Sequence, residues 1–185
     1  MLKPKISCIY LDMDGVIADF VKRYKELYHM EPREAEKDHR FDSFFTEFIA
    51  TGQFATLDLM PDAMVGIEFL RKCSAPTQIL SSTANEKRYD AISKQKMVWL
   101  QDKGITFKPN FVPGKRFKKE FAASDKIIID DTESVINDWN EAGGIGILHT
   151  DTAKTIQIVQ SILDDTYIHV YNESCGQDAY TTNTL

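Results

Sequence analysis

The stretch from residue 5 to residue 19 constrains the fold of this chain more than any other. It begins with a mostly apolar run, residues 6–11, and ends abruptly in two carboxylates, Asp12 and Asp14, with Gly15 directly after them. A short run that is apolar on both faces predicts a buried central strand of a parallel sheet. The carboxyl end of such a strand is where open α/β sheets bind their ligands.

The two acids at this strand end indicate a metal site. If the backbone stays extended, Asp12 and Asp14 point to the same side, and Gly15 permits the tight turn that must follow. Two carboxylates crowded together repel each other and raise a pKa unless a cation lies between them. The simplest interpretation is a Mg²⁺ site with oxygen ligands, at which a reaction of an anionic substrate is also catalysed.

A second segment repeats this pattern, because residues 126–131 form an apolar run that ends in Asp130 and Asp131. Further short apolar runs alternate with helical patterns, and one of them ends in Ser81 and Ser82. The alternation predicts an α/β fold, a doubly wound parallel sheet with helices on both faces, whose strand ends meet at one crevice. The expected strands are 6–11, 77–81, 111–112, 126–130 and 145–149, and the expected helices begin near 62 and span about 86–102, 132–142 and 152–163.

The region from 20 to 60 does not follow the alternation. Residues 29–42 are strongly polar and hard to fit into a core, whereas Phe41, Phe45 and Phe48 recur at helical spacing. We expect a small helical cap here, inserted after the first strand, with the catalytic core formed by residues 1–19 and 61–165. The remaining residues, 166–185, contain one possible strand, Tyr167 to Tyr171, and then a polar tail that is expected to be mobile.

Composition narrows the class of partner. The formal net charge of −6 argues against binding to a nucleic-acid polymer or an anionic membrane, although it leaves room for a small phosphate ester held by a metal and a few lysines. The three cysteines are unpatterned, so neither a disulfide framework nor a zinc site is indicated. No apolar stretch approaches the ~20 residues that span a bilayer, and the N-terminus does not resemble a signal peptide. A cytoplasmic location is therefore expected.

The strand ends together suggest phosphate chemistry. Acids from two strands can share one Mg²⁺, while a hydroxyl such as that of Ser81 and a lysine from residues 115–119 hold the other phosphate oxygens. One carboxylate can attack phosphorus to form an aspartyl-phosphate, and a second can protonate the leaving oxygen. The plainer alternatives are a turn or capping pair for each set of acids, and a solvated helix face for the lysines.

The residues resemble a known family at this point. The stretch from Asp12 to Asp19 looks like the first motif of the haloacid dehalogenase-like (HAD) phosphatase superfamily and, more narrowly, of the 5'(3')-deoxyribonucleotidases. The likeness covers about residues 5–150. It includes Gly52-Gln-Phe54, Leu57, Pro61 and Ala63 before the second strand, Ser81-Ser82 at its end, and Ile129-Asp130-Asp131 with Trp139 and Gly143-Gly144 after it.

The resemblance implies a Rossmann-like HAD core and a set of catalytic roles. Asp12 would be the nucleophile and Asp14 the general acid and base. Mg²⁺ would be held by the Asp12 side chain, the Asp14 backbone carbonyl and Asp130, with Asp131 in support.

The resemblance also implies substrate contacts. Ser81, where these nucleotidases more often have threonine, and Ser82 would bind phosphate together with Lys118 of an Arg-x-Lys pattern. Lys115 and Lys119 remain candidates, because the distance in sequence to Asp130 is slightly longer than expected. Phe54, and Phe44 or Phe45, could stack on a nucleobase.

We therefore expect a Mg²⁺-dependent phosphomonoesterase that hydrolyses nucleoside monophosphates, acting as a monomer or homodimer. The first alternative is a HAD phosphatase of a sugar phosphate or another small phosphometabolite, because the cap and not the core decides the substrate. The second is a phosphate- or partner-binding domain without turnover. The base, the sugar and the 5' or 3' position of the phosphate stay open.

Overall fold

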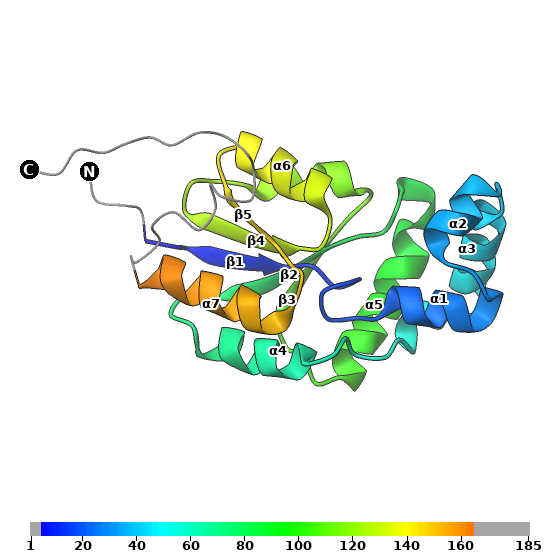
Figure 1. The fold of residues 1–185 in the computed structure, drawn as a ribbon, viewed down its shortest axis with the longest axis horizontal. Coiled ribbons are helices and arrows are strands. Elements are labelled where there is room, and N and C mark those ends of the chain that lie inside the picture. Colours follow the sequence, from blue (N-terminus) through cyan, green and yellow to red (C-terminus); the bar gives the residue numbers. More distant parts are fainter. Residues whose placement is uncertain (1–4, 165–185) are drawn as a thin grey trace, which may run out of the picture.

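The computed structural model describes residues 5–164, and its centre is a five-stranded, all-parallel sheet in the order β3-β2-β1-β4-β5 (Figure 1). The strands are β1 (Cys8–Leu11), β2 (Thr77–Ser82), β3 (Lys108–Val112), β4 (Lys126–Asp130) and β5 (Ile145–Leu148). The first strand is the central one and is buried along its whole length, as its unbroken apolar run predicts. The predicted fold class, α/β with a parallel sheet, is confirmed.

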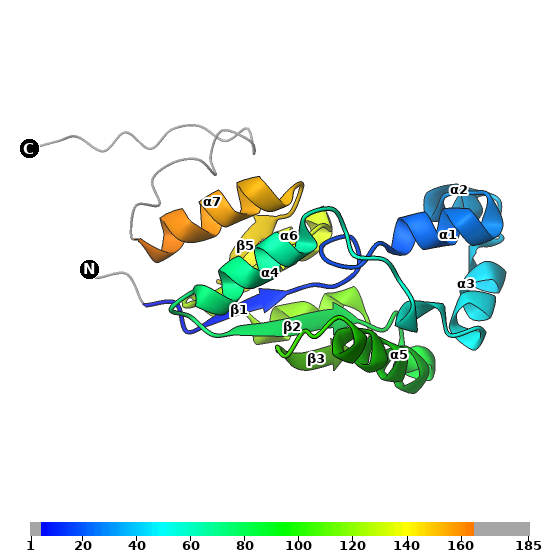
Figure 2. The ribbon, with the colours of Figure 1, turned by 90° about the horizontal axis from the view of Figure 1, so that it is seen from below.

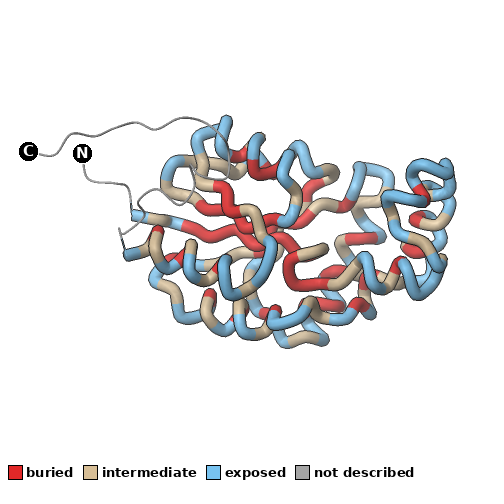
Figure 3. Tube along the Cα trace, viewed as in Figure 1, coloured by how far each residue is buried: buried red, intermediate tan, exposed pale blue. Residues whose placement is uncertain are grey.

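Helices cover both faces of this sheet, so alternate residues of each strand enter two different cores. One core combines Ile9, Leu11 and Ile79 with side chains of α4, α5 and α7, and the other combines Cys8 and Tyr10 with side chains of α6. Figure 1 shows α6 on one side of the sheet and α4 and α7 on the other. Figure 3 shows the buried residues concentrated along the strands between these layers.

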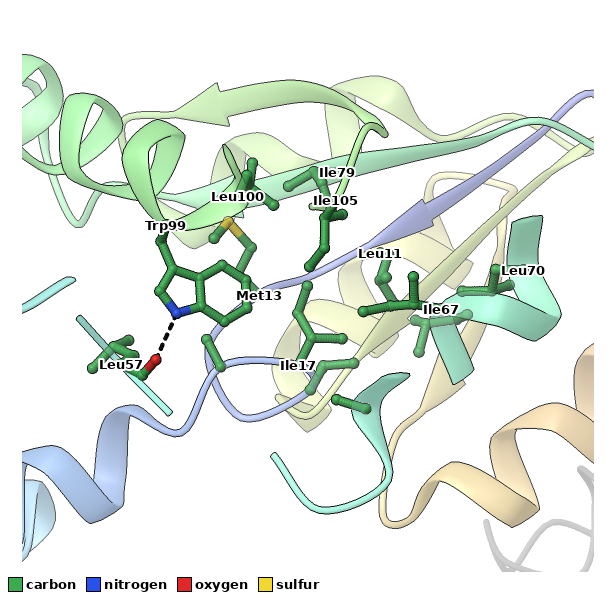
Figure 4. Close-up of a cluster of buried hydrophobic side chains, with 14 of the residues drawn as sticks. Leu11, Met13, Ile17, Leu57, Ile67, Leu70, Ile79, Trp99, Leu100 and Ile105 are labelled. Atoms are coloured by element: carbon green, nitrogen blue, oxygen red, sulfur yellow. Dashed lines mark hydrogen bonds between the residues drawn. The ribbon is translucent and has the colours of Figure 1, made fainter. Parts of the chain in front are cut away.

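The helices follow the predicted pattern closely in the core. Leu57 and Met13 pack beside Trp99 in the larger core, where the indole N–H of Trp99 donates to the Leu57 carbonyl at 2.8 Å (Figure 4). The helices are α1 (Phe20–Tyr28), α2 (Pro32–Lys37), α3 (Phe41–Ala50), α4 (Ala63–Lys72), α5 (Tyr89–Asp102), α6 (Glu133–Glu141) and α7 (Thr152–Leu163), with 3-10 segments η1 (Gln53–Ala55), η2 (Glu86–Arg88) and η3 (Lys115–Phe121).

Helices α1, α2 and α3 lie together beyond the carboxyl end of β1, where both views of the ribbon place them (Figures 1 and 2). Their interior is a set of aromatic rings that we call the aromatic cap cluster: Phe20, Tyr24, Phe45, Phe48 and Phe54. Edge-on and stacked pairs at centroid distances of 5.0 to 6.1 Å are within the range that aromatic quadrupoles favour.

The polar stretch 29–42, which the sequence suggested would be hard to fit into a core, is accommodated among these helices. It contains α2, which begins with a capping box between Glu31 and Glu34 and has Pro32 in its first turn. Only Ala35 of this helix is buried, so the stretch contributes one small side chain to the interior and leaves its charges in water.

The expected strand from Tyr167 to Tyr171 and the polar tail lie outside the described residues. Within residues 5–164, no helix has both the length and the apolar composition needed to cross a bilayer.

Candidate active site

The candidate site lies at the carboxyl ends of β1 and β4. Asp12 follows β1 directly and Asp130 is the last residue of β4. Because Leu11 pairs with Ile129 in the parallel register, the two acids occupy equivalent positions on neighbouring strands. The Asp12 backbone N–H donates to the Ile129 carbonyl at 3.0 Å, which fixes this alignment. Both acids are buried, with exposed fractions of 4% and 0%.

A buried lysine bridges the two acids. Lys118, in the 3-10 segment η3, places its Nζ 2.6 Å from Asp130 Oδ2, as a hydrogen bond, and 2.9 Å from Asp12 Oδ1. Its exposed fraction is 1%. An ammonium group at this depth costs several kcal/mol unless it is paired, and here it has two carboxylates as partners.

The other two lysines named from the sequence do not reach these acids. Lys115 donates to Thr132 Oγ1 at 2.9 Å beside the site, and Lys119 lies 3.7 Å from Asp138 with half of its side chain exposed. The structure therefore brings Lys118, and not its neighbours, between the two strand ends.

The electrostatics of the pair are asymmetric. Burial alone would raise the pKa of Asp12, but the ammonium groups of Lys118 and Lys96 outweigh it and hold that pKa below its ordinary value. Burial and the nearby charge of Asp12 raise the pKa of Asp130 to about 6, in spite of Lys118. The acid best suited to stay anionic is thus Asp12.

Asp131 completes the group from the turn after β4. Its carboxylate lies against Gly15, where an added Cβ would stand 2.1 Å from Asp131 Oδ2, and Gly15 has a φ of +79°. The glycine is needed for both the turn and the close approach. Burial and the charge of Asp12 raise the pKa of Asp131. We call Asp12, Lys118, Asp130 and Asp131 the strand-end cluster.

The strand-end cluster fits a hard divalent cation. Asp12, Asp130 and Asp131 each offer a carboxylate oxygen, and these oxygens lie within 4.8 Å of one another. Asp12 Oδ1 is buried, and within residues 5–164 its partner is the ammonium group of Lys118 at an ion-pair distance of 2.9 Å. An all-oxygen, anionic donor set of this kind suits Mg²⁺.

A second buried lysine, which the sequence analysis did not identify, lies behind Asp14. Lys96 of α5 has an exposed fraction of 1%, and its Nζ donates to Asp14 Oδ2 at 2.6 Å, to Ser81 Oγ at 2.8 Å and to the Ser82 carbonyl at 3.1 Å. Ser81 is buried at the end of β2, whereas Ser82 lines the open side of the site.

A cleft of about 740 Å³ opens in front of these groups. Its core wall includes Asp12, Asp14 and Ser82, and its cap wall includes Glu31 and Arg33. The site thus has carboxylates on its core side and the polar side chains of Glu31 and Arg33 on its cap side, and the cleft is large enough to admit a phosphate ester.

The two rings expected to stack on a base do not line this cleft. Phe54 is 3% exposed and stacks on Phe20 inside the aromatic cap cluster. Phe44 is half-buried and stacks on Tyr28 at a centroid distance of 4.5 Å. Phe20 is the ring of this cluster that lines the cleft.

Together these residues can support acyl-phosphate chemistry. Asp12 supplies a buried anion with a lowered pKa, Lys118 supplies positive charge beside it, and Asp14 lies two residues further at the cleft wall.

Comparison with known proteins supports the fold and leaves the activity open. No family model matches the sequence, and no curated protein matches it. Among solved structures, a hydrolase from Streptococcus pneumoniae TIGR4 aligns with 85% of this chain and 100% of its own at 15% identity and a TM-score of 0.51. A D,D-heptose 1,7-bisphosphate phosphatase from Burkholderia thailandensis aligns with 84% of this chain and 99% of its own at 11% identity and a TM-score of 0.49.

A HAD family hydrolase from Deinococcus radiodurans R1, solved with bound phosphate and sodium, aligns with 84% of this chain and 88% of its own at 14% identity and a TM-score of 0.45. Of these three structures, the Streptococcus hydrolase alone exceeds a TM-score of 0.5, and at its low identity it shows a shared fold only. The chain therefore has the Rossmann-like α/β core, with a five-stranded parallel sheet, that the HAD resemblance implies, and an acidic cluster lies at its strand ends.

Proposed function

We propose that this chain is a Mg²⁺-dependent phosphomonoesterase of the HAD type that hydrolyses nucleoside monophosphates. The observation that carries the proposal is the strand-end cluster. In it the carboxylates of Asp12 and Asp130 and the ammonium group of Lys118 are buried in contact at the carboxyl ends of two neighbouring strands. Burial of three charged groups is costly for a scaffold and useful for catalysis, because a preorganised charged site stabilises a phosphoryl transition state.

The first half of the reaction forms a covalent intermediate. An Asp12 carboxylate oxygen attacks phosphorus, a P–O bond to Asp12 forms, and the ester P–O bond breaks. Asp14 gives a proton to the leaving oxygen, so the product is an alcohol. Lys118, 2.9 Å from Asp12, and the hydroxyl of Ser82 at the cleft wall would hold the non-reacting phosphate oxygens, whereas Ser81 is buried and does not line the cleft.

The second half returns the enzyme to its starting state. A water molecule attacks the phosphorus of the aspartyl-phosphate while Asp14 takes its proton, and the bond to Asp12 breaks to release inorganic phosphate. Mg²⁺, held by the Asp12 side chain, the Asp14 carbonyl, Asp130 and Asp131, would neutralise charge on the phosphoryl group. The chain's own residues do the bond-making and the proton transfers.

A second candidate substrate, a sugar phosphate or other small phosphometabolite, is favoured by one observation. The cap wall of the cleft includes Glu31, Pro32 and Arg33 beside Phe20 and Val21, and it does not include the rings of Phe44 and Phe54. Polar side chains at this rim suit hydroxyl groups or a second anion at least as well as a nucleobase. A binding domain without turnover is disfavoured, because such a domain needs neither Asp12 nor Asp14.

Phosphate release from a panel of nucleoside monophosphates and sugar phosphates, with and without Mg²⁺, tests the proposal. Asp12→Asn is the control, since it keeps the shape and removes the anion. Release from nucleotides that requires both Mg²⁺ and Asp12 supports it. Activity confined to sugar phosphates would retain the mechanism and replace the substrate, and release that survives Asp12→Asn would refute the mechanism.

A further inference from the structure

We propose that Lys96 is a positioning residue that fixes the carboxylate of Asp14 for proton transfer to the leaving group. The inference rests on the proposed phosphomonoesterase function and adds a residue to its machinery. It starts from a buried lysine on α5, a helix that carries none of the motif residues.

The ammonium group of Lys96 is completely satisfied inside the protein. It has three N–H donors, and the structure gives it three oxygen acceptors: Asp14 Oδ2, Ser81 Oγ and the Ser82 carbonyl, at 2.6, 2.8 and 3.1 Å. The ring of Phe54 closes the remaining side, with Nζ 5.3 Å from its centroid. No donor is left for a phosphate oxygen, which separates Lys96 from a substrate-binding role.

One acid lies beside Lys96. Within residues 5–164, Asp14 is the carboxylate that lies within ion-pair distance of Lys96. A lysine that is 1% exposed, beside a site already rich in buried charge, costs free energy unless it is paired. A purely structural position on the inward face of α5 would be filled more stably by leucine or methionine.

The pairing orients Asp14. One oxygen, Oδ2, is held by Lys96, while the other, Oδ1, is buried and has no hydrogen-bond partner among residues 5–164. A carboxylate anchored through one oxygen cannot rotate freely, so Oδ1 is presented in one direction. Because Oδ2 is engaged by Lys96, Oδ1 is the oxygen left to carry the proton between the leaving group and water when substrate is bound.

The anchor itself is tied to the cap through α5. The neighbouring Gln95 accepts from the Phe54 backbone N–H at 3.1 Å and donates to the Ile49 carbonyl at 2.8 Å. Lys96 therefore lies between the end of β2, through Ser81 and Ser82, and the end of the cap segment, through the neighbouring Gln95.

The proposal predicts an effect that depends on the leaving group. A nucleoside alkoxide must be protonated as it leaves, whereas nitrophenolate is a stable anion and needs no proton. Lys96→Met, which fills the same volume without the charge, should lower kcat/KM for a nucleoside 5'-monophosphate about 10²-fold. The loss for p-nitrophenyl phosphate should be smaller by about tenfold or more.

Two further variants make the test specific. Lys94→Met removes an exposed lysine from the same helix and should change neither substrate. Lys96→Gln keeps an N–H donor for Asp14 and should recover part of the nucleotide activity; it also replaces Lys96→Met if thermal unfolding shows that the methionine variant does not fold.

Equal losses of kcat/KM on both substrates, or no loss, would overturn the inference. A lysine that binds phosphate, or that only stabilises the fold, would affect both substrates alike, because its effect does not depend on whether the leaving group needs a proton. Asp14→Asn should show the same split as Lys96→Met, and the double variant should be no worse than Asp14→Asn alone. If the wild-type protein hydrolyses no phosphate ester, the proposed function is refuted, and the catalytic role of Asp14 with it. If the enzyme is active and Lys96→Met loses the same activity on both substrates, only the positioning role of Lys96 is refuted.

Discussion

The strand-end cluster and the aromatic cap cluster are both buried, but they are stabilised by different forces. In the cap, rings such as Phe48 and Phe54 pack edge to face at 5.0 Å, and their burial is favourable without any specific partner. At the strand ends, Asp12, Lys118 and Asp130 are buried only because each charge has an opposite charge within 3 Å.

This difference distinguishes the residues that stabilise the fold from the residues that we expect to act on a substrate. Phe45, Phe48 and Phe54 do not line the cleft, so apart from the ring of Phe20 the aromatic cap cluster contributes shape and not substrate contacts. Burying charges at the strand ends costs free energy of folding, and such a cost is expected where function requires the charges.

The largest effect should follow from Lys118→Met. Removing the lysine leaves two buried acids facing each other, which should lower the free energy of unfolding by about 3–5 kcal/mol in urea titrations with EDTA. Activity in the folded protein should fall about 10²- to 10³-fold. The matched control is Lys119→Met, from the same 3-10 segment, whose half-exposed side chain should leave both quantities unchanged. A stability loss below about 1 kcal/mol would show that Lys118 does not carry this pairing.

Phe54→Ala tests the other side of the comparison. The ring is 3% exposed and packs on Phe20, Phe45 and Phe48, so its loss should lower the free energy of unfolding by about 3 kcal/mol. KM should shift by the same factor for a nucleotide and for an aryl phosphate, because the ring does not line the cleft. A KM rise confined to nucleotides would restore the base-stacking role that the family resemblance implies.

A smaller effect is expected at the cap rim. Arg33→Ala should raise KM about threefold and leave kcat and the unfolding curve unchanged, because an exposed rim charge contributes modest ground-state binding. Lys37→Ala, on the exposed side of the same helix, is the control. No change in KM across the substrate panel would exclude Arg33 from substrate contact.

The smallest effect concerns His149, which belongs to neither cluster. Its ring Nδ1 lies 2.9 Å from Thr155 Oγ1, and burial lowers its pKa in the folded state. The unfolded chain therefore binds a proton that the folded chain does not, so this group's stabilisation is lost as pH falls through about 6.5 toward the lower folded pKa.

Urea titrations at pH 7 and pH 5 should show a larger loss of stability for the wild type than for His149→Gln. Asp130, whose pKa is raised, acts with the opposite sign and is common to both proteins, so the difference isolates His149. Equal pH dependence in the two proteins would contradict the assignment.

The sequence predicted the sheet and its acids well because both follow from local pattern. An apolar run that ends in acids marks a buried parallel strand and its ligand-binding end, and this pattern located Asp12 and Asp130. The helix predicted over 152–163 matches α7, because Asp151 caps it and its apolar residues are regularly spaced.

The sequence could not locate Lys96, because a lone lysine in an amphipathic helix normally points to water. One signal was present: Ile92, Lys96 and Trp99 are spaced four and three residues apart, so the lysine interrupts the inward stripe of α5. Its meaning depends on Asp14, 82 residues away in sequence, and only the tertiary fold brings the two together. The role of the cap rings could not be predicted for a similar reason, since helical spacing shows that a ring faces inward but not whether a cleft lies there.

The most direct test of the central claim is to trap the covalent intermediate on Asp12. The enzyme is mixed with Mg²⁺ and a nucleoside monophosphate labelled with ³²P on the phosphate, quenched in acid within the first turnover, and mapped by peptide mass spectrometry. We predict a label on the peptide that contains Asp12, absent from Asp12→Asn and lost on treatment with hydroxylamine, which cleaves acyl phosphates. Rapid release of labelled phosphate with no label on that peptide, or a label on another residue, would contradict the assignment of Asp12 as the nucleophile.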